Sequence, residues 1–107
     1  MEKESVTFSV TEDRLIAHLH GEIDHHSARA VREKIDRETF LFRPRVLVID
    51  LSGVGFMDSS GIALILGRVE VAAASGGVVA VTGASPALTR LIRLSGIEKV
   101  KGLSVLP

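Results

Sequence analysis

The sequence predicts an α/β domain built on a mixed β-sheet, and three observations carry this prediction. Apolar and polar residues alternate near the N-terminus, which is typical of strands with one buried face. The run Val-Leu-Val-Ile at 46–49 is unbroken and mostly β-branched, as in strands that are covered on both faces. Further along, apolar residues recur every three or four positions, as in amphipathic helices. Strand, helix and strand in succession form crossovers, which join parallel strands by right-handed connections.

The first two strands form a predicted β-hairpin. The apolar residues that alternate with polar ones on either side of a turn at 11–13 are Val6, Phe8, Val10, Leu15, Ala17 and Leu19. Gly21 is expected to end the second strand.

The next elements are a helix and the central strand. Residues 27–38 are predicted to be helical, because their apolar positions repeat at intervals of three and four between charged residues. Residues 45–51 are predicted to form the centre of the sheet, and 52–55 a loop after it.

A second predicted helix ends near 75–77, where Ser-Gly-Gly stops its apolar pattern. The positions expected to face the core are Ile62, Ile65, Leu66, Val69, Ala72 and Ala73. A short strand follows at 78–81. Ser85 and Pro86 then open a third helix that closes near Gly96, and a last short strand is expected near 103–106.

The composition limits the classes of function. A chain of 107 residues is predicted to form one domain, 1–107, with a single hydrophobic core. Thirteen Lys and Arg balance thirteen Asp and Glu, so we expect no binding to nucleic acid or to an anionic membrane surface. The absence of cysteine excludes disulfides, thiolate zinc sites and cysteine nucleophiles. A charged N-terminal segment in place of a signal peptide, and no apolar run of membrane-spanning length, predict a cytoplasmic protein.

The most informative segment is Asp58-Ser59-Ser60-Gly61, between the central strand and the second helix. Its simplest interpretation is that Asp58 or Ser59 caps the helix, which contributes roughly 1 kcal/mol. A serine at this turn would also be exposed, and a phosphate added to it would carry about −1.5 to −2 charges beside a helix N-terminus that tolerates anions.

Enzymatic interpretations of this turn fit less well. A nucleophile elbow centred on Ser59 needs a glycine where Met57 stands, and no histidine follows the serine as in the hydrolases with that motif. A phosphate-binding loop ending at Gly61 lacks the Lys-Ser or Lys-Thr pair that must follow. We therefore expect no enzymatic activity and no bound cofactor.

Asp24 begins the other candidate site, at the start of the first helix. It is either a helix cap or an exposed carboxylate beside the serine turn, if the strands that lead into the two helices are neighbours. The four histidines, at 18, 20, 25 and 26, suggest a metal site at first sight. His25 and His26 would point about 100° apart on a helix and no cysteine completes a set, so no metal is expected.

Together these segments resemble the anti-sigma-factor antagonists of the STAS superfamily, in particular the sporulation type that acts on sigma factor F. The resemblance is carried by Gly-Glu-Ile-Asp-His-His at 21–26, Phe-Met-Asp-Ser-Ser-Gly at 56–61, Ile-Leu-Gly-Arg at 65–68 and Ile-Arg-Leu-Ser-Gly at 92–96. It covers nearly the whole chain and implies a mixed sheet with helices packed on it.

The resemblance also implies a mechanism. Ser59 would accept phosphate from ATP held by the anti-sigma factor, which is a serine kinase. The unphosphorylated protein would bind that kinase and free the sigma factor, phosphorylation would switch binding off, and a serine phosphatase would restore it. Asp24, Asp58, Ser59, Ser60 and Gly61 are the partner-binding residues that it implies. A STAS scaffold that binds without phosphorylation is the alternative that we keep.

Overall fold

The computed structural model describes residues 5–107. The elements along the chain are β1 (Val6–Thr11), β2 (Arg14–Ile23), α1 (Ala28–Phe42), β3 (Val46–Met57), α2 (Ser59–Ala74), β4 (Val78–Thr82), α3 (Pro86–Ser95), a 3₁₀ turn η1 (Ile97–Lys99) and β5 (Leu103–Val105). Their order confirms the predicted succession of strands and helices, including the short last strand.

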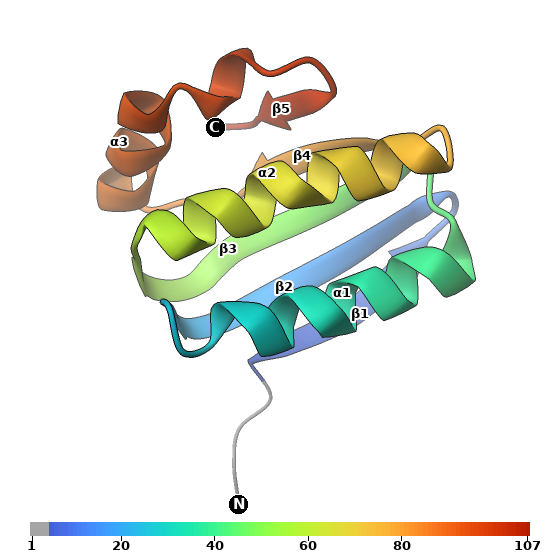
Figure 1. Ribbon diagram of the computed structural model, residues 1–107, viewed down its shortest axis with the longest axis horizontal. Coiled ribbons are helices and arrows are strands. Elements are labelled where there is room, and N and C mark those ends of the chain that lie inside the picture. The colour runs from blue at the N-terminus through green and yellow to red at the C-terminus, as the bar shows by residue number, and fades with distance from the viewer. Residues whose placement is uncertain (1–4) are drawn as a thin grey trace, which may run out of the picture.

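A single mixed sheet organises the described chain. Its five strands lie in the order β1-β2-β3-β4-β5, with β1 antiparallel to β2 and every other pair parallel. The helices α1 and α2 run side by side across one face of this sheet, and α3 lies near the end of β4 (Figure 1). The predicted fold class, α/β with an N-terminal hairpin and parallel strands, is therefore confirmed.

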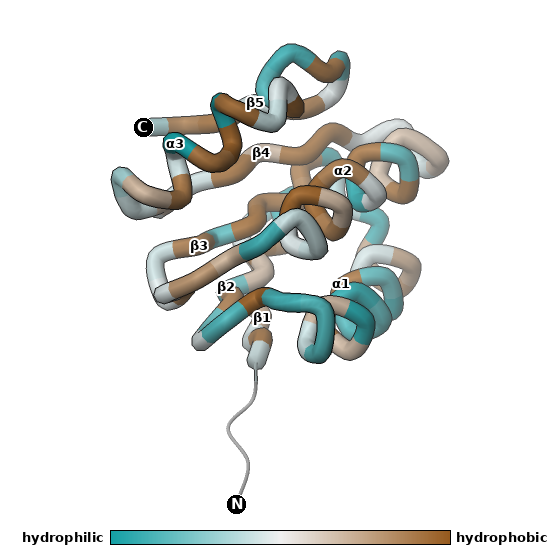
Figure 2. Tube along the Cα trace, turned by 60° about the vertical axis from the view of Figure 1, so that its left-hand side comes forward, coloured by the Kyte–Doolittle hydropathy of each residue, from teal (hydrophilic) through white to brown (hydrophobic). Residues whose placement is uncertain are grey.

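The core lies between the sheet and the helices. Alternate strand residues such as Ala17, Ile49 and Val81 are fully buried there, and they belong to one cluster with Ile35 of α1 and Ile65 of α2. Apolar residues dominate the inner strands and α2, whereas α1 is mostly hydrophilic because one side of it faces solvent (Figure 2). No helix in the range 5–107 is both long and apolar enough to span a membrane.

The two central strands are longer than predicted. β2 continues through Gly21 to Ile23, and the segment 52–55, expected to be a loop, belongs to β3. Register shifts in β2 after His18 and after Gly21, which has a φ of +82°, accommodate the extension. At Gly53 the strands approach so closely that a Cβ atom would lie 2.9 Å from the carbonyl oxygen of Leu19. Glycine at this position therefore permits pairing instead of ending it.

The first helix also extends beyond the predicted end at residue 38. Thr39 is buried and its hydroxyl donates to the carbonyl of Ile35 over 2.7 Å, which satisfies a polar group inside the packed face. The helix ends at Phe42, and Arg43, which caps its C-terminus, adopts a left-handed φ of 52°. Pro44 follows, and a proline disfavours helical geometry in the residue before it.

In α2 the buried face differs from the predicted one. The buried residues are Gly61, Leu64, Ile65, Arg68, Val69 and Ala72. Leu66 is 40% exposed and Ala73 is exposed, so both assignments to the core were wrong. The stripe of burial runs through Ile65 and Arg68, and Leu66 lies about 100° around the helix from Ile65.

Arg68 is the unexpected member of that stripe. It is only 5% exposed, and its guanidinium lies 3.1 Å from the carboxylate of Asp36 on α1. Burial lowers the pKa of Arg68, an effect that Asp36 opposes by favouring the charged form. This ion pair joins the two helices through a charged side chain, which an apolar pattern cannot reveal.

Candidate functional site

The two sequence motifs meet at one end of the sheet. β2 and β3 are parallel, with Ile23 opposite Met57, and the amide of Asp58 donates to the carbonyl of Ile23 over 3.3 Å. The turns leading into α1 and α2 consequently lie at the same end of the molecule (Figure 1). The predicted adjacency of Asp24 and the serine turn is thus confirmed, and it follows from parallel pairing.

Asp58 is the N-cap of α2. Its backbone is extended, and its Oδ1 accepts a hydrogen bond from the amide of Ser60 over 2.8 Å. This settles the capping question in favour of Asp58 over Ser59, because Ser59 is already the first helical residue. The cap fixes the first turn of α2 and contributes roughly 1 kcal/mol.

Ser59 is exposed and its hydroxyl forms no hydrogen bond within residues 5–107. It lies at the positive end of the α2 dipole, next to Asp58, whose carboxylate already accepts a hydrogen bond from the amide of Ser60. The arrangement offers an accessible hydroxyl whose modification would break no internal contact. An added phosphate would be tolerated by the helix terminus itself.

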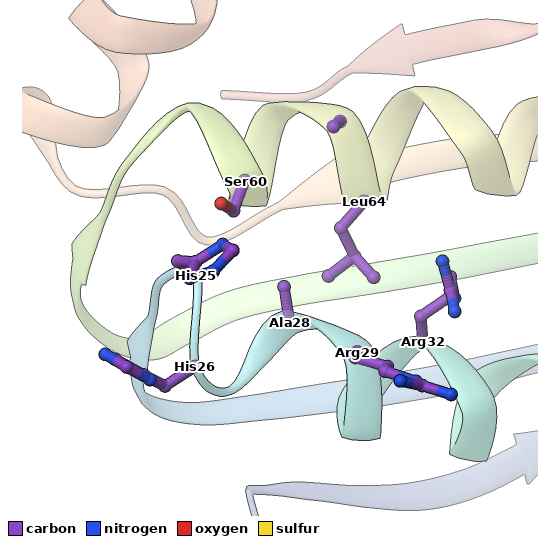
Figure 3. A pocket seen from close by; sticks show the side chains of 8 residues that line it. His25, His26, Ala28, Arg29, Arg32, Ser60 and Leu64 are labelled. Carbon is purple, nitrogen blue, oxygen red and sulfur yellow. The ribbon is translucent and has the colours of Figure 1, made fainter.

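Ser60 is half-buried and lines a groove of about 670 Å³ between α1 and α2. Among the other lining residues are His25, His26, Arg29 and Arg32. His25 lies close to Ser60 at one end of this groove, and the two arginines lie at the other (Figure 3). Sequence reasoning missed the groove, although the spacing of three between the arginines was a signal that they share a helix face.

Packing inside the protein explains why position 61 is a glycine. Gly61 is buried, and a Cβ atom there would overlap the side chain of Met57. Glycine thus lets the first turn of α2 pack directly against the end of β3. The predicted contact of Gly61 with a partner stays a prediction, because this packing alone accounts for the residue.

Asp24 organises the turn before α1 and does not cap the helix directly. Its Oδ1 accepts from the amides of His26 (2.9 Å) and Ser27 (3.0 Å), and Ser27 occupies the N-cap position. The hydroxyl of Ser27 in turn donates to the carbonyl of Glu22 over 2.7 Å. The bond from the Ser27 amide and the neighbouring His26 lower the pKa of Asp24, so its carboxylate is charged at neutral pH.

The four histidines lie in two separate places. His18 and His20 share one face of β2, as predicted, and this face points away from α1 and α2. His25 and His26 belong to the turn before α1, with ring centroids 5.7 Å apart. Within residues 5–107, no three His, Asp or Glu side chains gather as a metal site. No histidine is hydrogen-bonded to Ser59 in the same range.

Comparison with known proteins gives a consistent result. The STAS domain model matches residues 5–104. The chain is 38% identical over 86 residues to an anti-sigma F factor antagonist of Paenibacillus polymyxa, covering 80% of this chain and 74% of that protein. Among solved structures, the unphosphorylated anti-sigma factor antagonist SpoIIAA has a TM-score of 0.71 at 26% identity, covering 95% of this chain and 87% of its own.

The phosphorylated form of the Bacillus cell fate determinant SpoIIAA is similar to the same degree. Its TM-score is 0.69 at 27% identity, with 95% of this chain and 91% of that chain covered. The sheet order, the paired turns and the sequence likeness thus agree, and the chain belongs to the STAS-domain family as one of its anti-sigma-factor antagonists.

Proposed function

We propose that this protein is a phosphorylation-controlled switch that binds an anti-sigma factor kinase and thereby frees sigma factor F during sporulation. The unphosphorylated form binds, phosphate on Ser59 ends binding, and a serine phosphatase restores the protein. The observation that carries the proposal is the exposed Ser59 hydroxyl at the start of α2, directly after the capping residue Asp58 and at the same end of the sheet as Asp24. The protein acts as substrate and ligand in the cytoplasm, while the kinase holds the ATP.

Ser59 is the better phosphate acceptor of the two serines. Ser60 is half-buried, its amide is bound by Asp58, and its side chain lies on the wall of the groove. A kinase must bring the γ-phosphate within bonding distance of the hydroxyl and in line with it. An exposed first helical residue allows that approach without displacement of α1.

A phosphate at Ser59 weakens binding through charge. Asp24 and Asp58 already place two carboxylates at this end of the sheet. A further dianion must be desolvated or paired when the partner covers it, and juxtaposition with acidic groups or nucleotide phosphates costs several kcal/mol. The sites of binding and of modification are then one surface, so phosphorylation itself is sufficient for release.

Phosphopeptide mapping tests the acceptor. After incubation of the wild-type chain with ATP and a cognate anti-sigma kinase, we expect phosphate on Ser59 alone. Ser59→Ala should bind the kinase and take up none, whereas Ser60→Ala should still be phosphorylated. Phosphate on Ser60 would overturn the assignment, and a partner that binds without any transfer would favour the passive scaffold.

Replacement of Asp24 by asparagine tests the second half of the surface. Asparagine can accept the same two amide bonds, so the turn and the melting temperature should change little. Loss of a charged hydrogen-bonding group should weaken binding to the kinase about tenfold or more. Calorimetric binding and thermal unfolding of one preparation separate the two effects. If only the melting temperature falls, Asp24 serves the turn and not the partner.

A further inference from the structure

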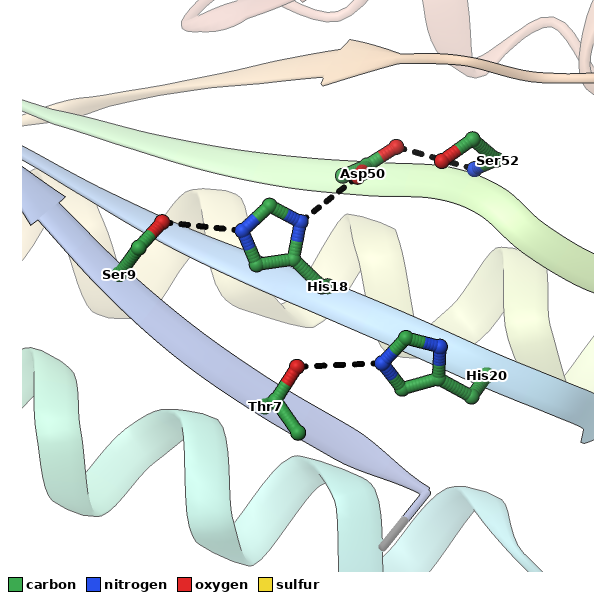
Figure 4. Close-up of polar contacts among 6 residues, drawn as sticks. All are labelled: Thr7, Ser9, His18, His20, Asp50 and Ser52. Atoms are coloured by element: carbon green, nitrogen blue, oxygen red, sulfur yellow. Dashed lines mark hydrogen bonds and ion pairs between the residues drawn. The ribbon is translucent and has the colours of Figure 1, made fainter.

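The face of the sheet opposite α1 and α2 carries a chain of three hydrogen-bonded side chains, one from each of β1, β2 and β3 (Figure 4). The hydroxyl of Ser9 lies 2.9 Å from Nε2 of His18. Nδ1 of the same ring lies 2.7 Å from Oδ2 of Asp50. These are the contacts, and the ring nitrogens, by which a serine, a histidine and an aspartate form a nucleophilic triad.

The strand register brings the three residues together. His18 and Asp50 are direct partners in the parallel pair of β2 and β3. On β1 the partner of His18 is Thr7, so Ser9 is two residues further along and reaches the ring diagonally. All of these side chains lie on one face because strand residues alternate between faces.

The proton positions follow from the contacts of Asp50. Burial alone would raise the pKa of this carboxyl, but the amide of Ser52 on Oδ1 (3.0 Å) and the ring of His18 outweigh it and the pKa is lowered. The carboxylate is therefore an acceptor only, and Nδ1 of His18 must carry the proton. In the neutral ring Nε2 then accepts, which requires Ser9 to donate its hydroxyl proton to the ring.

We propose that Ser9 is a nucleophilic serine that takes an acyl group from small activated esters, with His18 as its base and Asp50 as the residue that orients His18. The Ser9 oxygen bonds to the ester carbonyl carbon while Nε2 of His18 takes the hydroxyl proton. The bond from that carbon to the alcohol oxygen then breaks, and His18 returns the proton to the departing oxygen. Acyl-Ser9 and a free alcohol are the products.

The surroundings set the range of acyl donors. Ser9 is exposed, whereas His18 and Asp50 are largely covered, with 33% and 19% of their side chains accessible. A donor can therefore approach the hydroxyl from solvent while the base is held in place. Acceleration rests on the positioned base, for which about 10²- to 10⁴-fold is typical. This is why the proposal is confined to donors with a good leaving group.

The same face supplies an internal control. Thr7 and His20 make a contact of the same kind as Ser9 and His18, with 3.1 Å between the hydroxyl oxygen of Thr7 and Nε2 of His20. In the described part of the chain no carboxylate is hydrogen-bonded to His20. His20 thus resembles His18 in strand, face and hydroxyl partner, but it lacks the residue that would orient it as a base.

The test uses the full chain with p-nitrophenyl acetate as the donor and mass spectrometry to read the acetylation rate of each serine. We expect Ser9 to react at least a hundredfold faster than the exposed Ser104, and this advantage to vanish in urea. Ser9→Ala should yield no adduct at position 9. His18→Gln and Asp50→Asn should each slow the reaction at Ser9 at least tenfold, while His20→Gln should leave it unchanged.

Three outcomes would overturn the proposal. Acetylation of Ser9 no faster than that of Ser104 would mean that the hydroxyl is not activated. Persistence of the advantage in urea would mean that the fold does not cause it. An equal effect of His18→Gln and His20→Gln, in variants shown by circular dichroism to be folded, would mean that the carboxylate contact has no chemical role. The wild-type comparison with Ser104 decides the first point even if Asp50→Asn fails to fold.

Discussion

Exchange of Ser59 for aspartate is expected to weaken binding to the anti-sigma kinase by at least a hundredfold and to leave the fold intact. An acidic residue in the first turn of a helix is favourable, because it interacts with the positive end of the dipole. At the interface the same carboxylate adds to those of Asp24 and Asp58, and juxtaposed like charges cost several kcal/mol. The dissociation constant measured by calorimetry should therefore rise, while the melting temperature stays close to that of the wild type.

Ser59→Asn is the matched control, since asparagine has nearly the same size as aspartate but no charge. If the charge of aspartate causes the loss of affinity, Ser59→Asn should bind with close to wild-type affinity. If the size of the side chain causes it, Ser59→Asn should bind as poorly as Ser59→Asp. Undiminished binding by Ser59→Asp, or by protein phosphorylated on Ser59, would contradict the switch. A fall in melting temperature that parallels the loss of affinity would show that the turn had been disrupted instead.

Substitution of Ile65 by alanine is expected to lower the free energy of unfolding by about 2 to 5 kcal/mol, as for other large-to-small changes in a packed core. Ile65 is fully buried under the sheet. Its neighbour Leu66 is 40% exposed, and Leu66→Ala should change stability by only about 0.5 kcal/mol. Urea denaturation of both variants measures the difference, provided that the slopes agree.

Equal losses of unfolding free energy in the two variants would contradict the assignment of Ile65 to the buried face of α2 and of Leu66 to the exposed one. If Leu66→Ala keeps its stability and loses affinity for the kinase, Leu66 belongs to the binding surface, to which its exposed side of α2 is available.

The parts of the fold that depend on local chemistry were predictable. Ser85 caps α3 by accepting from the amide of Leu88, Pro86 follows at the first helical position, and Gly96 closes the helix with a φ of 80°. Each of these residues determines the backbone of its own neighbourhood, so its effect is visible in the sequence. The position of Asp24 beside the serine turn was predictable for a different reason, because parallel strands place their carboxyl ends together.

The errors share a physical cause, which is that they concern contacts between distant segments. Considered alone, Gly21 predicts the end of a strand and Gly53 predicts a loop. The pairing of β2 with β3 carries both strands past these glycines, with two register shifts. The burial of Arg68 on α2 depends on its ion pair with Asp36, which lies on α1 and is distant in the sequence. The triad on the far face requires the register of three strands, which no single segment specifies.

The hydrogen bond from the amide of Asp58 to the carbonyl of Ile23 has a consequence for the kinetics of the switch. It attaches the serine turn to the most extensively paired strands of the sheet, so the turn is already ordered before a partner arrives. Association then loses little conformational entropy at this site, and the rate of encounter should not be limited by a folding step. Affinity changes on phosphorylation should accordingly be found mainly in the dissociation rate, and amide hydrogen exchange at the start of α2 should be equally slow in both forms of the protein.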